Sequence, residues 1–473
     1  MKKPLLALAV ATAGVCLITP KFLSDNTRTQ LTQIVAKIND IPGYDLVILN
    51  TEQSWFSTSS TLAFGLDLAA FDPDVANNPQ FEEMMEDFKF TLELDMQHGP
   101  ILLGKGLGLT DFQLRIPTIS EQITFEGEKV ENIYLIDGKL NLFGDLSYTD
   151  SISPMTIEFD NGSGKVSFSG YSGVATHQNG GIAYTGQAAS LAVDTPVITL
   201  SLSTISNDWT GKFDLEMLLT GLYHEMEVSL GIGKFVVSDA TQQLVALDDL
   251  KLYVSNSLDE NDIADMKGAY RIAKAATPID VFEDIEIAFE VNNISQQAMS
   301  QYTDTMISLQ DPRMNEEQLQ TLIKPFVFEL VKAEPEVKIT NVGFTTAAGT
   351  LKSQADIKLA DYAIDDTKFM EATFWQNNLL LNSSASLPKT LLVDLVQKNL
   401  MMQFQADPSA AQYASEQLQE MAAQQAEITA NNLVQSGFLV EQNGVLLLNF
   451  KVKDGMSDLN GQSIPLAAIL PAK

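Results

Sequence analysis

The chain has 473 residues, of which 45% are hydrophobic and 19% charged, so it can bury a core and is not disordered by composition. It carries 29 basic and 61 acidic residues, a formal net charge of −32. Such a surface repels nucleic acid and anionic lipid headgroups, which excludes nucleic-acid binding. Cys16 is the only cysteine, so the rest of the chain cannot hold a disulfide framework or a cysteine metal site.

The N-terminus has the pattern of a membrane-targeting segment. Lys2 and Lys3 form a positive start, and residues 4–20 are apolar or small throughout. Because positive charges stay on the cytoplasmic side, we expect an uncleaved inner-membrane signal anchor over 1–23, with the rest of the chain in the periplasm. Cleavage near Ala11-Thr12-Ala13 is the alternative, since the apolar run is shorter than the roughly 20 residues that span a bilayer. Val15 precedes Cys16 where a lipoprotein signal needs a small residue, so lipidation is not expected.

A helix follows the anchor. Ser24 and Asp25 can cap it, and we expect it over residues 24–40. Apolar residues at helical spacing give it one apolar face: Leu31, Ile34, Val35 and Ile38. We interpret it as a stalk helix that packs on the body, although a partner helix or the membrane surface could receive the same face.

Residues 41–294 alternate apolar with polar side chains, which indicates antiparallel strands with one wet face. The clearest run is 88–96, and shorter runs lie at 166–168, 252–254 and 285–291. Turn signals separate such runs: Asp137-Gly138, Asn161-Gly162 and Asn179-Gly180-Gly181. We interpret a cluster of glycines as serving turns and bulges: Gly170, Gly173, Gly180, Gly181 and Gly186.

Two helical inserts are expected after this region, at 295–335 and 388–436. The first should break at Asp311-Pro312-Arg313 and bend at Pro325, and the second should break near Asp407-Pro408. Strands are expected between the inserts, at 336–387. A β-hairpin is expected over 437–473, because Asn443-Gly444 stands between two apolar runs.

These elements predict a β-rich α+β fold. We expect an extended antiparallel β-meander or open barrel-like sheet with helical inserts, behind the N-terminal anchor and stalk helix. No linker rich in proline, serine or glycine separates the pieces, so residues 24–473 are expected to form a single extended periplasmic body.

The motifs that carry chemistry are incomplete. The chain has three histidines, His98, His177 and His224, which would have to converge from distant strands to form a triad or a zinc site. His224-Glu225 begins like a zinc-protease helix, but Val228 stands where the second histidine is needed.

Two glycine-rich runs also fall short of ligand-binding fingerprints. Leu109 replaces the third glycine of a nucleotide loop after residues 104–108, and Val166 replaces the hydroxyl residue of a phosphate loop, so both runs are interpreted as turns. The acidic run Asp259-Glu260-Asn261-Asp262 lacks the glycine and terminal glutamate of a calcium loop, and is interpreted as a solvated turn. The sequence therefore predicts no catalytic, cofactor-binding or metal-binding residue.

Several short motifs occur together in a characteristic order: Trp55-Phe56-Ser57, His98-Gly99-Pro100, Phe168-Ser169-Gly170, Tyr184-Thr185-Gly186, Ser300-Gln301-Tyr302 and Leu459-Asn460-Gly461-Gln462. With the Lys-Lys anchor and the stalk helix, this order resembles the YdgA-like family (YdgA and YihF) of bacterial envelope proteins, a domain of unknown function. The resemblance implies an inner-membrane anchor and a β-rich periplasmic body. It implies no activity and no catalytic residues.

Three functions follow as hypotheses. The first is a non-enzymatic, membrane-anchored periplasmic protein that binds lipid or another hydrophobic ligand, or acts as an envelope scaffold. The second is an envelope hydrolase that uses acidic residues, which would require converging carboxylates in a cleft. The third is homo-oligomer assembly through the helix at Ala410 to Leu433, whose small residues permit close helix packing.

Overall fold

The computed structural model describes residues 23–24, 26–40, 43–66, 89–117, 123–125, 128–159, 163–178, 181–212, 225–299, 301, 316–360, 369, 371–407, 410 and 412–466. Packing divides the chain into two compact units. The first unit is Met1–Pro196, Thr204–Gly221 and Thr303–Leu319, and the second is Val197–Ser203, Leu222–Tyr302 and Gln320–Lys473. One boundary falls inside strand β15 (Ile198–Gly211) rather than in a linker, so composition gives no sign of it.

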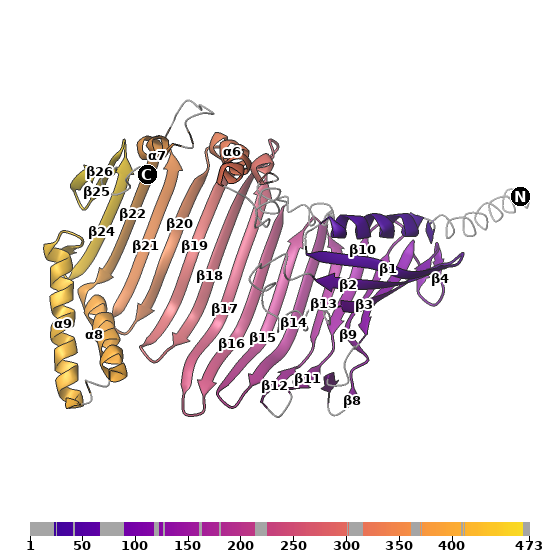
Figure 1. The fold of residues 1–473 in the computed structure, drawn as a ribbon, viewed down its shortest axis with the longest axis horizontal. Coiled ribbons are helices and arrows are strands. Elements are labelled where there is room, and N and C mark those ends of the chain that lie inside the picture. The colour runs from indigo at the N-terminus through magenta and orange to yellow at the C-terminus, as the bar shows by residue number, and fades with distance from the viewer. Residues whose placement is uncertain are drawn as a thin grey trace, which may run out of the picture. The chain divides into compact units, whose positions relative to one another are not determined.

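The strands of the first unit are β1 (Tyr44–Gln53), β2 (Ser57–Leu66), β3 (Lys89–His98), β4 (Ile101–Leu102), β5 (Gly106–Leu107), β6 (Thr110–Pro117), β7 (Ile123–Phe125), β8 (Glu128–Lys129), β9 (Asn132–Leu140), β10 (Leu146–Ile152), β11 (Met155–Glu158), β12 (Lys165–Phe168), β13 (Tyr171–Gln178) and β14 (Gly181–Asp194). Their antiparallel pairings run β1-β2-β3-β6-β9-β10-β13-β14-β12-β11-β7-β8. The expected antiparallel β region is therefore confirmed, and Figure 1 shows these strands in colours from indigo to magenta.

The helix expected after the anchor is present, over residues 26–39, and hydrogen bonds at both of its ends join it to the first strands. Near its start, the Ser24 hydroxyl donates to the carbonyl of Ser54 at 3.1 Å. At its end, the side chain of Asn39 exchanges two hydrogen bonds with the backbone of Leu46, at 2.7 and 2.9 Å. Leu46 and Leu62 are almost fully buried on this part of the sheet. Within the described residues, no helix is both long and apolar enough to cross a membrane. Residues 4–20 lie outside the described part.

The second unit contains β16 (Met226–Asp239), β17 (Gln243–Leu258), β18 (Ile263–Ala276), β19 (Val281–Ser295), β20 (Glu336–Thr346), β21 (Gly349–Leu359), β22 (Leu379–Pro388), β23 (Val440–Gln442), β24 (Val445–Lys453), β25 (Met456–Leu459) and β26 (Gln462–Pro465). Pairings run in sequence from β16 to β22 and then to β24. In the described residues of both units the pairings form open antiparallel sheets, so the open sheet is confirmed.

Helices lie where the inserts were expected. Helix α6 (Glu316–Lys332) contains Pro325, and the pair α8 (Lys389–Ala406) and α9 (Ser415–Gln435) follows β22. The short helix α7 (Ala372–Asn378), before β22, was not predicted. The predicted break at residues 311–313 lies outside the described residues.

Helices α8 and α9 lie side by side (Figure 1). Three alanines of α9 are fully buried at four-residue spacing: Ala422, Ala426 and Ala430. Leu391 of α8 is also fully buried, and Leu418 of α9 is nearly so. The small-residue face of this helix is thus packed within the chain.

The C-terminal hairpin is confirmed at Asn443-Gly444, where both residues have positive φ, 52° and 79°. This backbone is that of a two-residue hairpin turn whose twist matches the flanking strands. Asp454-Gly455 and Asn460-Gly461 repeat it before β25 and β26, so the end of the chain has three such turns where one was predicted.

The turn predicted at Asp137-Gly138 is wrong. Both residues lie inside β9, and Gly138 is paired with Phe112 of β6. A Cβ on Gly138 would lie 2.2 Å from the Phe112 ring, so glycine here accommodates an aromatic side chain from the next strand. Gly173 and Gly186 are likewise inside strands rather than at turns or bulges, for a related reason given below. Asn161-Gly162 and Asn179-Gly180 lie outside the described residues.

Candidate functional site

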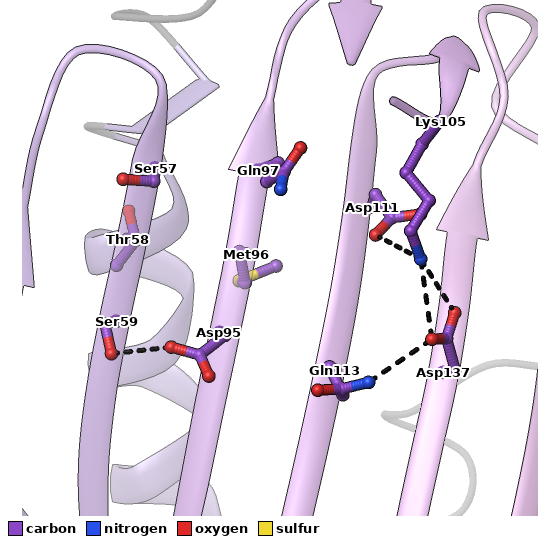
Figure 2. Close-up of a pocket in the computed structure, with 10 residues that line it drawn as sticks. All are labelled: Ser57, Thr58, Ser59, Asp95, Met96, Gln97, Lys105, Asp111, Gln113 and Asp137. Carbon is purple, nitrogen blue, oxygen red and sulfur yellow. Dashed lines mark hydrogen bonds and ion pairs between the residues drawn. The ribbon is translucent and has the colours of Figure 1, made fainter. Parts of the chain in front are cut away.

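A polar groove of about 360 Å³ lies on one face of β2, β3, β6 and β9 in the first unit (Figure 2). The strand register places its side chains in rows, because directly paired residues of neighbouring strands point to the same face. One row is Ser59, Asp95, Gln113 and Asp137, and the row beside it contains Ser57, Gln97 and Asp111. These residues come from four separate strands.

Lys105 reaches over the groove from the hairpin of β4 and β5. Its ammonium lies 3.3 Å from Asp111 and 3.5 Å from Asp137. Hydrogen bonding to Asp111 raises the pKa of Lys105 above its ordinary value. The backbone carbonyl of Lys105 accepts a hydrogen bond from Lys139 at 2.9 Å. The glycine run 104–108, which the sequence identified as a turn, thus positions a cation over two carboxylates.

Asp95 occupies the other side of the groove. It accepts a hydrogen bond from Ser59 at 2.7 Å and forms an ion pair with Arg115. Gln113 donates to Asp137 at 3.3 Å. Each of the three carboxylates in the groove is therefore already engaged by a cation, an amide or a hydroxyl. The hydrolase hypothesis requires a carboxyl group placed to exchange protons with a substrate, and this arrangement does not favour it.

A buried polar chain lies on the opposite face of the same strands. Because the carbonyl of Ser54 can only accept, the Ser24 hydroxyl donates to it. Ser24 then accepts from Thr58 at 3.3 Å, and Thr58 accepts from Nε2 of His98 at 2.9 Å. This leaves Nδ1 of His98 without a proton, and among the described residues it has no hydrogen-bond partner.

His98 is 1% exposed, and its burial lowers the pKa of the imidazole. It borders a second cavity, of about 220 Å³, with Phe56, Ile101 and Leu103. A bend at Gly99-Pro100 directly follows His98, and the sequence did not indicate that the ring is buried.

The other residues that the sequence singled out have local partners or lie outside the described part of the chain. His177 lies at the surface and is hydrogen-bonded to Asp145, and His224 is outside the described residues. Asp259 accepts hydrogen bonds from the backbone of Ile263 and Asn261, at 2.9 and 2.8 Å, which lower its pKa and confirm a turn. No group of three or more metal-ligating side chains occurs in the described part of the chain.

A buried carboxylate, Asp150, is surrounded by tyrosines on the apolar side of the first unit. Tyr134 and Tyr184 donate to it at 3.1 and 2.9 Å, and Tyr171 shares a hydrogen bond with Tyr184. Burial raises the pKa of Tyr134 and of Tyr184 well above the ordinary value, and Asp150 adds to the effect. The phenols therefore remain protonated donors that satisfy the carboxylate.

The second unit presents a large apolar face. Leu230, Leu252, Tyr270, Ile287 and Val342 are paired in one row across β16 to β20. Leu230, Tyr270 and Ile287 are 39%, 50% and 45% exposed. Two apolar rows flank this one on β16 to β19: Val228, Val254, Gly268 and Phe289 on one side, and Ile232, Leu250, Ile272 and Ile285 on the other.

The opposite face of the same strands is charged. Lys267 lies 3.5 Å from Glu290, and Arg271 lies 2.6 Å from Glu286. A sheet with one charged face normally buries its other face. Here the apolar face is half-buried to exposed instead.

A family model described as a bacterial protein of unknown function (DUF945) matches residues 1–467. The chain belongs to this family. The match covers both units, so the groove, the buried polar chain and the apolar face all lie within the family's domain. No curated protein and no solved structure matches the chain. The family assigns no activity to any of these sites.

Proposed function

We propose that this protein is a non-enzymatic component of the bacterial envelope, of the YdgA-like kind, held at the inner membrane by residues 4–20 with its body in the periplasm. Its second unit binds the acyl chains of lipids on the apolar face described above. The apolar run after Lys2 and Lys3 supports the anchor.

The exposed row Leu230, Tyr270 and Ile287 carries the binding proposal. With its two flanking rows it makes an apolar area three rows deep and four strands wide, or roughly 14 Å by 14 Å from strand spacing and rise. Contiguous exposed apolar surface of this kind marks a binding site in soluble domains. An anchor that holds the body beside a bilayer makes acyl chains the nearest apolar ligand.

The test is photo-crosslinking of the full chain in vesicles that contain a phospholipid with a diazirine-bearing acyl chain. Peptide mapping by mass spectrometry should find the label on β18 and β19, in peptides that contain Tyr270 and Ile287. Replacing both residues with serine should reduce that label several-fold, because the hydroxyl side chains remove most of the exposed apolar surface of the row.

Tyr253→Ser is the matched control. Tyr253 is 40% exposed, similar to Tyr270, but it lies on the opposite face of β17. It should leave the labelling unchanged. Two results would contradict acyl-chain binding on this face: no label on β16 to β19, or an equal loss of label in the double serine variant and in Tyr253→Ser.

A further inference from the structure

Three connections meet at one end of the sheet in the first unit: residues 54–56, residues 99–109 and residues 141–145. They join β1 to β2, β3 to β6 and β9 to β10, and these strands are paired with one another. The amide of His98 donates to the carbonyl of Phe56 at 2.7 Å, and that of Leu109 donates to the carbonyl of Leu140 at 2.9 Å. The three connections therefore lie side by side.

Large apolar side chains project from all three. Leu103 is 79% exposed and Phe143 is 91% exposed, the two highest values among the exposed large hydrophobic residues described. Five more are exposed in the same connections: Trp55, Phe56, Ile101, Leu107 and Leu142. We call these seven side chains the apolar tip. Turns of soluble proteins usually carry polar residues, so an apolar group on three adjacent turns calls for a binding partner.

The hairpin of β4 and β5 holds its share of the tip in place. Leu102 is 2% exposed, so it fixes the hairpin to the body while its neighbours Ile101 and Leu103 face outward. Gly104 and Gly106, with φ of 76° and 85°, permit the tight reversal. The exposed residues are thus presented by a fixed turn.

The charge of the three connections differs from that of the chain. They contain one basic and one acidic residue, Lys105 and Asp145, whereas the chain has a net charge of −32. Lys105 bends back onto the groove, and Asp145 is hydrogen-bonded to His177. The tip can therefore approach a lipid surface without the repulsion that the rest of this acidic chain would meet.

The tip is also tethered to the end of the apolar N-terminal segment. Ser24 is hydrogen-bonded to Ser54 and Thr58, at the edge of the first connection. Pro20, the last residue of the apolar run, precedes Ser24 by four residues, a span of at most about 14 Å. A bilayer that held residues 4–20 would lie within that reach.

We propose that the apolar tip inserts into the bilayer surface beside the anchor, with Trp55 and Phe143 at the boundary between headgroups and acyl chains, where aromatic side chains are favoured. The inference rests on the proposed anchor and adds a second, independent membrane contact. It is separate from the apolar face of the second unit.

Trp55 is a built-in probe, because the chain has three tryptophans, Trp55, Trp209 and Trp375. The full chain with Trp209→Phe and Trp375→Phe is reconstituted into phosphatidylcholine vesicles whose acyl chains are unmodified or dibrominated. Bromine quenches indole only on contact, so we expect the Trp55 emission to be lower in the brominated vesicles than in the unmodified ones. In the matched variant with Trp55→Phe and Trp375→Phe, Trp209 stacks on Tyr184 and should not be quenched.

Leu103→Asp with Phe143→Asp should abolish most of the quenching of Trp55, since both side chains are exposed and their loss removes no core packing. Val174→Asp, on an exposed strand position outside the tip, should not. The same aspartate substitutions, made in the background with Trp55→Phe and Trp375→Phe, should leave the Trp209 emission unchanged, which shows that the unit is folded.

Flotation with the vesicles separates the two claims. Molecules that float without quenching of Trp55 would overturn tip insertion and leave the anchor intact. Failure to float would overturn both. Floating molecules with quenching that the double aspartate variant removes would support tip insertion.

Discussion

Gly173 of β13 and Gly186 of β14 are directly paired, and the space above them holds the hydroxyl groups of Tyr171 and Tyr184. A Cβ on Gly173 would lie 2.1 Å from the Tyr184 hydroxyl and 2.2 Å from the Asp150 carboxylate. On Gly186 it would lie 1.7 Å from the Tyr171 hydroxyl. The paired glycines therefore make room for a buried carboxylate and the phenols that satisfy it.

Gly173→Ala should destabilise the first unit by about 1–3 kcal/mol, because the added methyl group displaces Tyr184 from Asp150. Chemical denaturation followed by Trp209 fluorescence measures this, since Trp209 stacks on Tyr184. Val174→Ala is the matched control. Its side chain is 51% exposed on the other face of β13, so the change should stay within about 0.5 kcal/mol. Equal effects from the two variants would contradict the role of the glycine pair.

The limits of sequence reasoning in this fold are visible in two similar dipeptides. Asn443-Gly444 and Asp137-Gly138 both resemble hairpin turns, and only the first forms one. A hairpin turn requires positive φ at its two central residues, and asparagine followed by glycine meets this local requirement, so the sequence alone indicates the turn. The glycine at 138 instead makes room for Phe112, which is distant in sequence. Strand periodicity and helical inserts were predictable because they are local, whereas strand pairing and glycine–aromatic contacts are not.

The tyrosines around Asp150 should make stability depend on alkaline pH. Burial raises the pKa of Tyr134 and Tyr184 in the folded state, while tyrosines of the unfolded chain ionise near pH 10. Their contribution is therefore fully present below about pH 10 and is lost as the pH rises toward the folded-state pKa. We expect the free energy of unfolding to fall above pH 10.

Tyr134→Phe should make that fall shallower, as measured by denaturation at a series of alkaline pH values. Tyr44→Phe, at an exposed tyrosine of the same unit, should leave the slope as it is in the unmodified chain. If Tyr134→Phe leaves the alkaline fall in the free energy of unfolding unchanged, the phenol proton of Tyr134 is bound no more tightly in the folded state than in the unfolded chain.

His98 should produce a dependence on acid pH. Burial lowers its pKa, so the unfolded chain takes up the proton first, near pH 6.5. The contribution of the neutral ring is fully present above about pH 6.5 and is lost as the pH falls through the folded-state pKa. We expect stability to decline as the pH falls below about 6.5, and His98→Gln, which keeps an amide donor for Thr58, should remove most of that decline.

His177→Gln controls for the loss of any histidine, because this ring lies at the surface beside Asp145. The acid decline should persist in that variant. If both variants lose it to the same extent, the burial of His98 is not its cause.

The candidate groove was less predictable than the fold. The groove combines Lys105 from the hairpin of β4 and β5 with Asp111 of β6 and Asp137 of β9. Only the pairing of β6 with β9 brings the two carboxylates together under the lysine. No spacing along the chain encodes that contact. The glycines around Lys105 correctly indicated a turn, but what the turn faces depends on strands that sequence alone could not align.

The buried alanines of α9 give the last prediction. Ala426 is fully buried where α9 packs beside α8, so Ala426→Leu adds three carbon atoms to a filled contact. Overpacking of this kind should cost about 1–3 kcal/mol in the free energy of unfolding, as measured by denaturation followed by circular dichroism. Gln424→Leu adds a leucine to an exposed position of the same helix and should be nearly neutral. A neutral Ala426→Leu would contradict this prediction. It would mean that the alanine face of α9 has room for larger side chains, so that close packing within the chain is not the reason for its small residues.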